Sequence, residues 1–270
     1  MLRWALSVLV FLMPTFAAAD ENFIILQSTT STQNSGLFTA ILPKFEHETG
    51  IEVRVVAVGT GQALRNARNG DGDALLVHSK ADEEQFVEDG FGIARSDVMY
   101  NDFVVVGPSA DLANVSDGKS VEDAFSAILG ANAKFISRGD DSGTHKAELR
   151  LWALSGYGPT SHSGQWYIET GSGMGATLNM ASALGGYTLT DRATWIAFAN
   201  KGDLKILFEG DAHMFNQYGV IVLNPAVHPA VKSYEAGLFS EWLLGAKGQA
   251  EIAEYKVDGQ QLFFPNAISR

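Results

Sequence analysis

The chain has 270 residues, no cysteine and a formal net charge of −12 at pH 7. The missing cysteine excludes disulfides, thiolate nucleophiles and cysteine-ligated metals. The acidic balance argues against nucleic acid or an anionic membrane as a partner. A chain of this length can bury large cores, and it most naturally divides into two lobes.

Residues 1–19 have the pattern of a secretory signal peptide. Arg3 gives a short basic start, residues 4–16 are almost entirely apolar, and residues 17–19 are three alanines typical of a cleavage site. The apolar stretch is too short to span a membrane. We therefore expect an exported, soluble chain that begins at residue 20. Without Arg3 its net charge is −13, from 18 basic and 31 acidic residues, so an anion site must act locally, through backbone dipoles and nearby cations.

The next part of the chain repeats one pattern, in which an apolar strand leads through a loop of glycine and hydroxyl residues into a helix. The first loop, Gln27–Gly36, has six hydroxyls and no charge, and the second, Val58–Gln62, contains two glycines. Pro43 is expected to kink or shorten the first helix. Such repeats predict a parallel, doubly wound sheet. The expected strands are 23–26, 51–55 and 73–78, and the expected helices are 37–45, 63–67 and 81–87.

The second half repeats the pattern and then returns. Phe103–Val106 is a β-prone strand that could cross between lobes, and Phe215–Leu223 is the expected return strand. Apolar residues at helical spacing after residue 230 should pack back on the first lobe. The expected division is a first lobe of residues 20–104, a second lobe of residues 105–216 and a return segment of residues 217–270.

The stretch Ser137–His145 has the composition of an anion cradle between a strand and a helix. The first N–H groups of a helix have no internal partner and carry the positive end of its dipole. An oxyanion placed there satisfies them, and Arg138, Ser142 and Thr144 could add side-chain donors. The alternative is a plain helix cap by Ser142 or Thr144, with Asp140 pairing Arg138.

The three polar loops are stronger evidence for a ligand site together than singly. Each alone could be an ordinary turn. In open α/β sheets, however, ligands lie beyond the carboxyl ends of the strands, which is where all three loops fall. Two lobes that face each other across a cleft would direct these loops at one point.

Motifs for catalysis, metals and cofactors are weak. Gly171–Ala176 superficially matches a dinucleotide loop but lacks the following βαβ unit and acid. The six histidines have no metal-ligand spacing. A periplasmic hydrolase or phosphatase with Ser142 or Ser116 as nucleophile would lack a positioned base, a metal and an acid pair. We therefore expect a binding protein that is not an enzyme and has no cofactor or metal.

With these residues assembled, the chain resembles the tungstate-binding periplasmic proteins of ABC uptake transporters, over essentially the whole segment after residue 19. Each motif is common, but the ordered set is specific. The motifs that carry the resemblance are Ser28–Thr32, Val58–Ala63, Ser137–Thr144, Gly175–Leu178 and Tyr187–Arg192.

The resemblance implies a type II periplasmic-binding-protein fold, with two α/β lobes, each a doubly wound mostly parallel sheet, joined by two crossover strands. It further implies a periplasmic location, tungstate with molybdate as a second ligand, a membrane permease as partner, and Asp140 as the residue that orients Arg138. Gly175 is a weaker ligand candidate. The ligand-binding residues carried over are Thr29, Thr30, Ser31, Thr60, Gly61, Arg138, Ser142, Gly143 and Thr144.

Phosphate is the rival ligand, because phosphate-binding proteins share the Arg-x-Asp-x-Ser-Gly-Thr pattern of Arg138–Thr144. Phosphate at neutral pH still carries a proton and favours an acceptor carboxylate, whereas tungstate and molybdate favour donors only. Phosphate-binding proteins place such an acid at the strand end that corresponds here to His78-Ser79. The absence of an acid favours a donor-only site.

Overall fold

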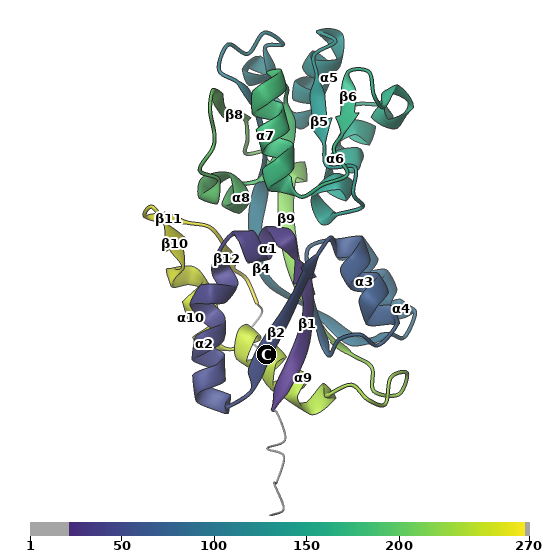
Figure 1. Ribbon diagram of the computed structural model, residues 1–270, viewed down its shortest axis with the longest axis vertical. Coiled ribbons are helices and arrows are strands. Elements are labelled where there is room, and N and C mark those ends of the chain that lie inside the picture. Colours follow the sequence, from purple (N-terminus) through teal and green to yellow (C-terminus); the bar gives the residue numbers. More distant parts are fainter. Residues whose placement is uncertain (1–21, 268–270) are drawn as a thin grey trace, which may run out of the picture.

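The computed structural model describes residues 22–267, so the expected signal peptide lies outside the described residues. Two α/β lobes are joined by two long strands, β4 (Gly92–Pro108) and β9 (Phe215–Leu223), as Figure 1 shows. β9 has the bounds expected for the return strand, and the two-lobed fold with crossover strands is confirmed. Among residues 22–267, no helix combines the length and apolar character needed to cross a membrane.

The first lobe is a sheet with the strand order β12-β4-β9-β3-β1-β2. Strands β2, β1 and β3 run parallel, whereas β9 is antiparallel to β3 and β4. Helices pack on both faces, so β3 is apolar throughout: Ala74 and Leu76 face one core, and Leu75 and Val77 face the other. The elements of this lobe are β1 (Phe23–Thr29), α1 (Thr30–Asn34), α2 (Leu37–Thr49), β2 (Glu52–Val58), α3 (Thr60–Arg68), β3 (Ala74–Val77), α4 (Lys80–Glu88), α9 (Ser233–Leu244), α10 (Ala246–Glu254), β10 (Lys256–Val257), β11 (Gln260–Gln261) and β12 (Phe264–Pro265).

The second lobe is built around the end of β4. Two strands pair with that end antiparallel, and a separate parallel pair leads into the cradle. Phe125, Phe135, Trp152 and Tyr167 form an aromatic core with edge and stacked ring contacts. The elements of this lobe are α5 (Val121–Gly130), β5 (Phe135–Ser137), α6 (Gly143–Leu154), β6 (Tyr167–Glu169), α7 (Met174–Leu184), β7 (Thr188–Asp191), α8 (Arg192–Ala197) and β8 (Leu204–Phe208).

Strand β4 supplies side chains to the cores of both lobes. Val98 and Met99 are fully buried in the first-lobe core, and Phe103 and Val105 are buried in the second-lobe core. One ribbon serves both cores because consecutive stretches of its 17 residues lie in different lobes. The expected lobe boundaries after residues 104 and 216 fall inside the two crossover strands.

The structure departs from the expected elements in three places. The polar loop Gln27–Gly36 contains the end of β1 and the short helix α1, because Thr29 caps that helix. Pro43 lies inside α2, which continues to Thr49 and is not shortened. The first half of β4 was not expected, since Arg95 and Asp97 interrupt its apolar pattern; Arg95 is nevertheless half-buried and paired with Glu83 and Asp97.

Candidate functional site

The cradle joins β5 to α6 and contains both a helix cap and an ion pair. The Ser142 hydroxyl accepts from the N–H of His145 at 3.2 Å and so caps α6. Arg138 is only 3% exposed, and its Nη2 donates to Asp140 Oδ2 at 2.6 Å. Asp140 Oδ1 accepts from the Ser142 N–H. Asp140 therefore fixes both the guanidinium and the start of the loop.

The loop after β1 meets this guanidinium from the other lobe. Ser31 is buried, and its hydroxyl accepts from Arg138 Nη1 at 3.4 Å. Thr30 begins α1 and is half-buried. The Thr29 hydroxyl lies 2.8 Å from that of Thr32 and accepts from the Thr32 N–H, so it serves as the helix cap.

Thr60 and Thr144 carry buried hydroxyls for which the described residues provide no hydrogen-bond partner. Thr60 begins α3 in the first lobe, and Thr144 lies in the first turn of α6 in the second. A Cβ added at Gly143 would lie 2.9 Å from Thr60 Oγ1, so the two lobes are in contact here. Buried polar atoms are nearly always paired, and an orphaned one calls for an explanation. The position of these two hydroxyls on facing loops makes them candidate ligand donors.

Gly61 takes part in a contact between the lobes. Its N–H donates to the Asp141 carbonyl at 3.3 Å. A Cβ at Gly61 would lie 2.0 Å from Asp141 Oδ2, and that carboxylate pairs with Arg65 at 2.9 Å. Lys146 adds a second ion pair across the lobes, with Asp82 at 2.8 Å. The structure is therefore a closed form in which the Gly61 N–H is engaged by the opposite lobe.

His78 also lies in this region. From the sequence, its position was notable only because it holds no acidic residue. It directly follows β3, it is 6% exposed, and its ring lies against Gly143. Burial lowers its pKa to about 4, with Asp191 acting to raise the pKa and Arg138 to lower it. The ring is therefore neutral at pH 7. Its position at the carboxyl end of a parallel strand is the signal that could have identified it.

A buried carboxyl group supports the cradle from behind. Glu148 of α6 accepts a hydrogen bond from the Tyr167 hydroxyl at 2.7 Å, and that hydroxyl lies 2.9 Å from Ser137 Oγ. Burial raises the pKa of Glu148 to about 8, against the lowering effect of these two hydroxyls. Glu148 is therefore mostly protonated at pH 7 and holds the end of β5 as a neutral group.

Replacing Glu148 with glutamine should stabilise the protein increasingly as the pH rises. The carboxyl pKa is near 4.5 in the unfolded chain and about 8 in the folded one, so between these values the unfolded chain binds fewer protons and wild-type stability falls. The free energy of unfolding of Glu148→Gln relative to wild type should grow from pH 5 to pH 9 by on the order of 3 kcal/mol. Urea unfolding at pH 5, 7 and 9 measures this difference. Glu88→Gln, which changes an exposed glutamate of α4, is the control and should retain the wild-type slope; equal slopes for wild type and Glu148→Gln would refute the expectation.

The serines considered as nucleophiles have structural partners. Ser116 Oγ lies 2.8 Å from Asp111 Oδ2, and Asp111 also accepts from the backbone N–H of Ser116. Ser142 Oγ serves as the α6 cap. Both hydroxyls therefore serve local structure, within the Asp111–Ser116 turn and at the start of α6, and a serine hydrolase is not favoured.

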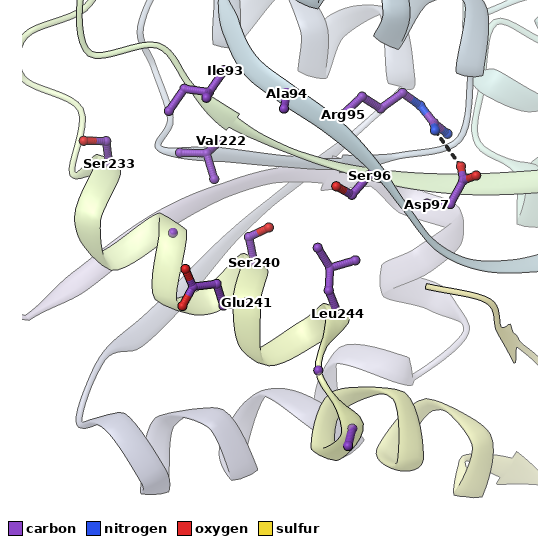
Figure 2. Close-up of a pocket in the computed structure, with 13 residues that line it drawn as sticks. Ile93, Ala94, Arg95, Ser96, Asp97, Val222, Ser233, Ser240, Glu241 and Leu244 are labelled. Carbon is purple, nitrogen blue, oxygen red and sulfur yellow. Dashed lines mark hydrogen bonds and ion pairs between the residues drawn. The ribbon is translucent and has the colours of Figure 1, made fainter. Parts of the chain in front are cut away.

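Two hollows lie near the crossover strands. One of about 970 Å³ lies between the start of β4 and α9, and Figure 2 shows Ile93, Val222 and Leu244 lining it together with serines and Glu241. None of the nine expected ligand residues lines it. A smaller one of about 360 Å³ reaches His78 and Gly143 between the lobes. The converging loops, rather than the larger hollow, mark the candidate site.

Several known proteins resemble this chain in sequence and in fold. Residues 15–247 match the family model described as a PBP superfamily domain. The tungstate-binding protein TupA of Peptoclostridium acidaminophilum is 48% identical over 248 residues, which cover 90% of this chain and 86% of that protein. The tungstate-binding protein TupA of Desulfovibrio alaskensis G20 has a solved structure, 47% identical, with a TM-score of 0.78 over 91% of this chain and 99% of that one. The structure described as the tungstate ABC transporter from Geobacter sulfurreducens is 46% identical, with a TM-score of 0.79 over 87% and 99% of the two chains.

Proposed function

This chain belongs to the PBP superfamily and, within it, to the family of TupA tungstate-binding proteins, and from that membership we propose that it captures tungstate between its two lobes for uptake by an ABC transporter. The protein acts as a solute-binding component and not as an enzyme. Molybdate, which is nearly the same size, is the second ligand to be expected.

The observation that carries this proposal is the pair of orphaned hydroxyls on opposite lobes, Thr60 Oγ1 and Thr144 Oγ1. Both are buried beside the loop that holds Arg138. A tetrahedral oxyanion with four acceptor oxygens would satisfy both hydroxyls and receive a charge-assisted bond from the guanidinium. The proposed ligand-binding residues are Thr29, Thr30, Ser31, Thr60, Gly61, Arg138, Ser142, Gly143 and Thr144.

The surroundings of the site favour an anion without a proton. Asp140 accepts from Arg138 through Oδ2 and from the Ser142 N–H through Oδ1, so both of its oxygens are engaged within the cradle. Hydrogen phosphate needs an acceptor for its own proton, and a buried donor without an acceptor is unfavourable. Tungstate and molybdate carry no such proton at neutral pH, which supports them over phosphate.

Delivery requires a partner in the membrane. We propose that the mature chain works in the periplasm and transfers its ligand to a membrane permease with an attached ATPase. Release follows from reopening of the lobes, since a ligand that contacts both lobes stabilises only the closed form.

Calorimetric titration of residues 20–270 with tungstate, molybdate, sulfate and phosphate at pH 7 tests the proposal. We expect one-to-one binding of tungstate, binding of molybdate, and no heat of binding from phosphate or sulfate at the same concentrations. Phosphate binding without tungstate binding would overturn the donor-only site. Absence of binding by all four anions would overturn the function as a whole.

A further inference from the structure

His78 and Gly143 form a close contact between the two lobes. A single carbon added at Gly143 would lie 2.7 Å from Cε1 and 2.8 Å from Nδ1 of His78. Real Cβ atoms do not approach other atoms so closely, so only glycine fits at this position, and the start of α6 packs directly against the ring. The contact lies beside Thr60, whose hydroxyl is 2.9 Å from the same point.

The ring of His78 is held firmly from behind. It stacks on Tyr218, which is fully buried, with ring centroids 4.8 Å apart. Its Nδ1 lies 3.1 Å from Asn216 Oδ1. Because the residues behind the ring are closely packed, the ring has no space to move away from Gly143.

A chain of buried hydrogen bonds behind the ring determines which of these groups donate and which accept. Asn216 Nδ2 donates to Asn101 Oδ1 at 2.7 Å, and Asn101 Nδ2 donates to Asp191 Oδ1 at 3.4 Å. An ionised carboxylate only accepts, so each amide has one orientation and His78 must donate through Nδ1–H. This tautomer is assigned from the network.

The chain of hydrogen bonds crosses both strands that connect the lobes. Asn101 of β4 and Asn216 of β9 are direct partners in the antiparallel register. Asp191 ends β7 in the second lobe, and His78 follows β3 in the first. The support of His78 is therefore anchored at the joint between the lobes, where any further closing would have to displace it.

We propose that His78 is a steric stop that limits how far the lobes close, and that it thereby selects large tetrahedral oxyanions over small ones. This inference rests on the proposed function. The stop fixes the separation between the Thr60 hydroxyl and the N–H groups at the start of α6. A large ion spans that separation, whereas a small one leaves donors on one lobe without an acceptor. Because the ring is neutral, its selection acts through size and not through charge.

The test compares tungstate with sulfate, which has the shorter bonds to oxygen. In His78→Ala the lobes lose their stop and can close further on sulfate. The ratio of sulfate to tungstate dissociation constants should then fall about tenfold, which corresponds to the gain of one hydrogen bond to sulfate. Tungstate binding is measured by calorimetry, and sulfate binding by competition at millimolar concentrations. His228→Ala is the matched control, because His228 also stacks on an aromatic ring, Phe91, and packs closely against a glycine, Gly70. It should leave the ratio unchanged.

A second variant approaches the same contact from the other lobe. In Gly143→Ala the added methyl meets His78 only when the lobes close, so tungstate binding should weaken while each lobe folds normally. In the double variant with His78→Ala the methyl keeps only its contact with the Thr60 hydroxyl, which can rotate away, so its effect on tungstate affinity should be several-fold smaller. The histidine tautomer, read from the ¹⁵N shifts of the ring, should be Nδ1–H in wild type.

The outcomes separate the inference from the proposed function. An unchanged sulfate-to-tungstate ratio in a folded His78→Ala, or additive effects in the double variant, would overturn the stop while tungstate binding by wild type stands. A wild-type protein that binds no tungstate would overturn the proposed function instead.

Discussion

Replacing Arg138 with alanine is expected to weaken tungstate binding by roughly a hundredfold or more. The guanidinium is buried, forks onto Asp140 and extends Nη1 to the opposite lobe at Ser31. Its removal leaves the anion without this buried cation and leaves the Asp140 carboxylate beside the ligand. Calorimetric titration with tungstate measures the loss.

Two further variants separate charge from geometry. Arg138→Lys keeps the charge but loses the planar fork, so it should bind with intermediate affinity. Arg68→Ala is the matched control, because it removes a paired arginine at the far end of α3, where Arg68 contacts Asp89. It should bind tungstate as wild type does. Undiminished binding by Arg138→Ala would remove Arg138 from the site.

Replacing Gly61 with alanine is expected to accelerate tungstate release by roughly tenfold or more. The new Cβ would overlap Asp141 Oδ2 at 2.0 Å and crowd the Asp141 carbonyl at 2.9 Å. A side-chain carboxylate can rotate away, but the carbonyl belongs to the backbone of the facing loop, so the lobes must separate. Stopped-flow release of tungstate and the radius of gyration of the saturated protein measure the two effects.

Two variants serve as controls. One changes a glycine far from this contact, and the other changes a residue that pairs with Asp141. Gly237→Ala places a methyl in open space on α9 and should release tungstate at the wild-type rate. Arg65→Ala removes an exposed ion pair with Asp141 and a hydrogen bond to Gln62, and such exposed pairs contribute little. Unchanged release by Gly61→Ala would show that the contact with Asp141 does not govern closure.

The sequence was sufficient where the signals are local. Ser142 followed by glycine and threonine before an apolar helical pattern predicts a helix cap, and the structure places the start of α6 there. The alternation of Phe215–Leu223 predicts a strand with the observed bounds. The ordered motifs predicted the family by resemblance, and the three polar loops among them lie at the carboxyl ends of β1, β2 and β5.

The sequence was insufficient where the relevant contacts join distant residues. Arg65 and Asp141 are 76 positions apart, and Asn101 and Asn216 are 115 apart. Neither pair leaves a periodic pattern, since each polar residue is an isolated exception in its own element. The position of Gly61 against Asp141 also depends on how closely the lobes approach, which no single segment determines.

Strand β4 has a thermodynamic consequence beyond joining the lobes. Because consecutive stretches of this one ribbon complete both hydrophobic cores, neither lobe can melt without withdrawing buried side chains from the other. We therefore expect the unfolding of the two lobes to be coupled, so that a destabilising substitution in either lobe also depletes the population of molecules able to bind.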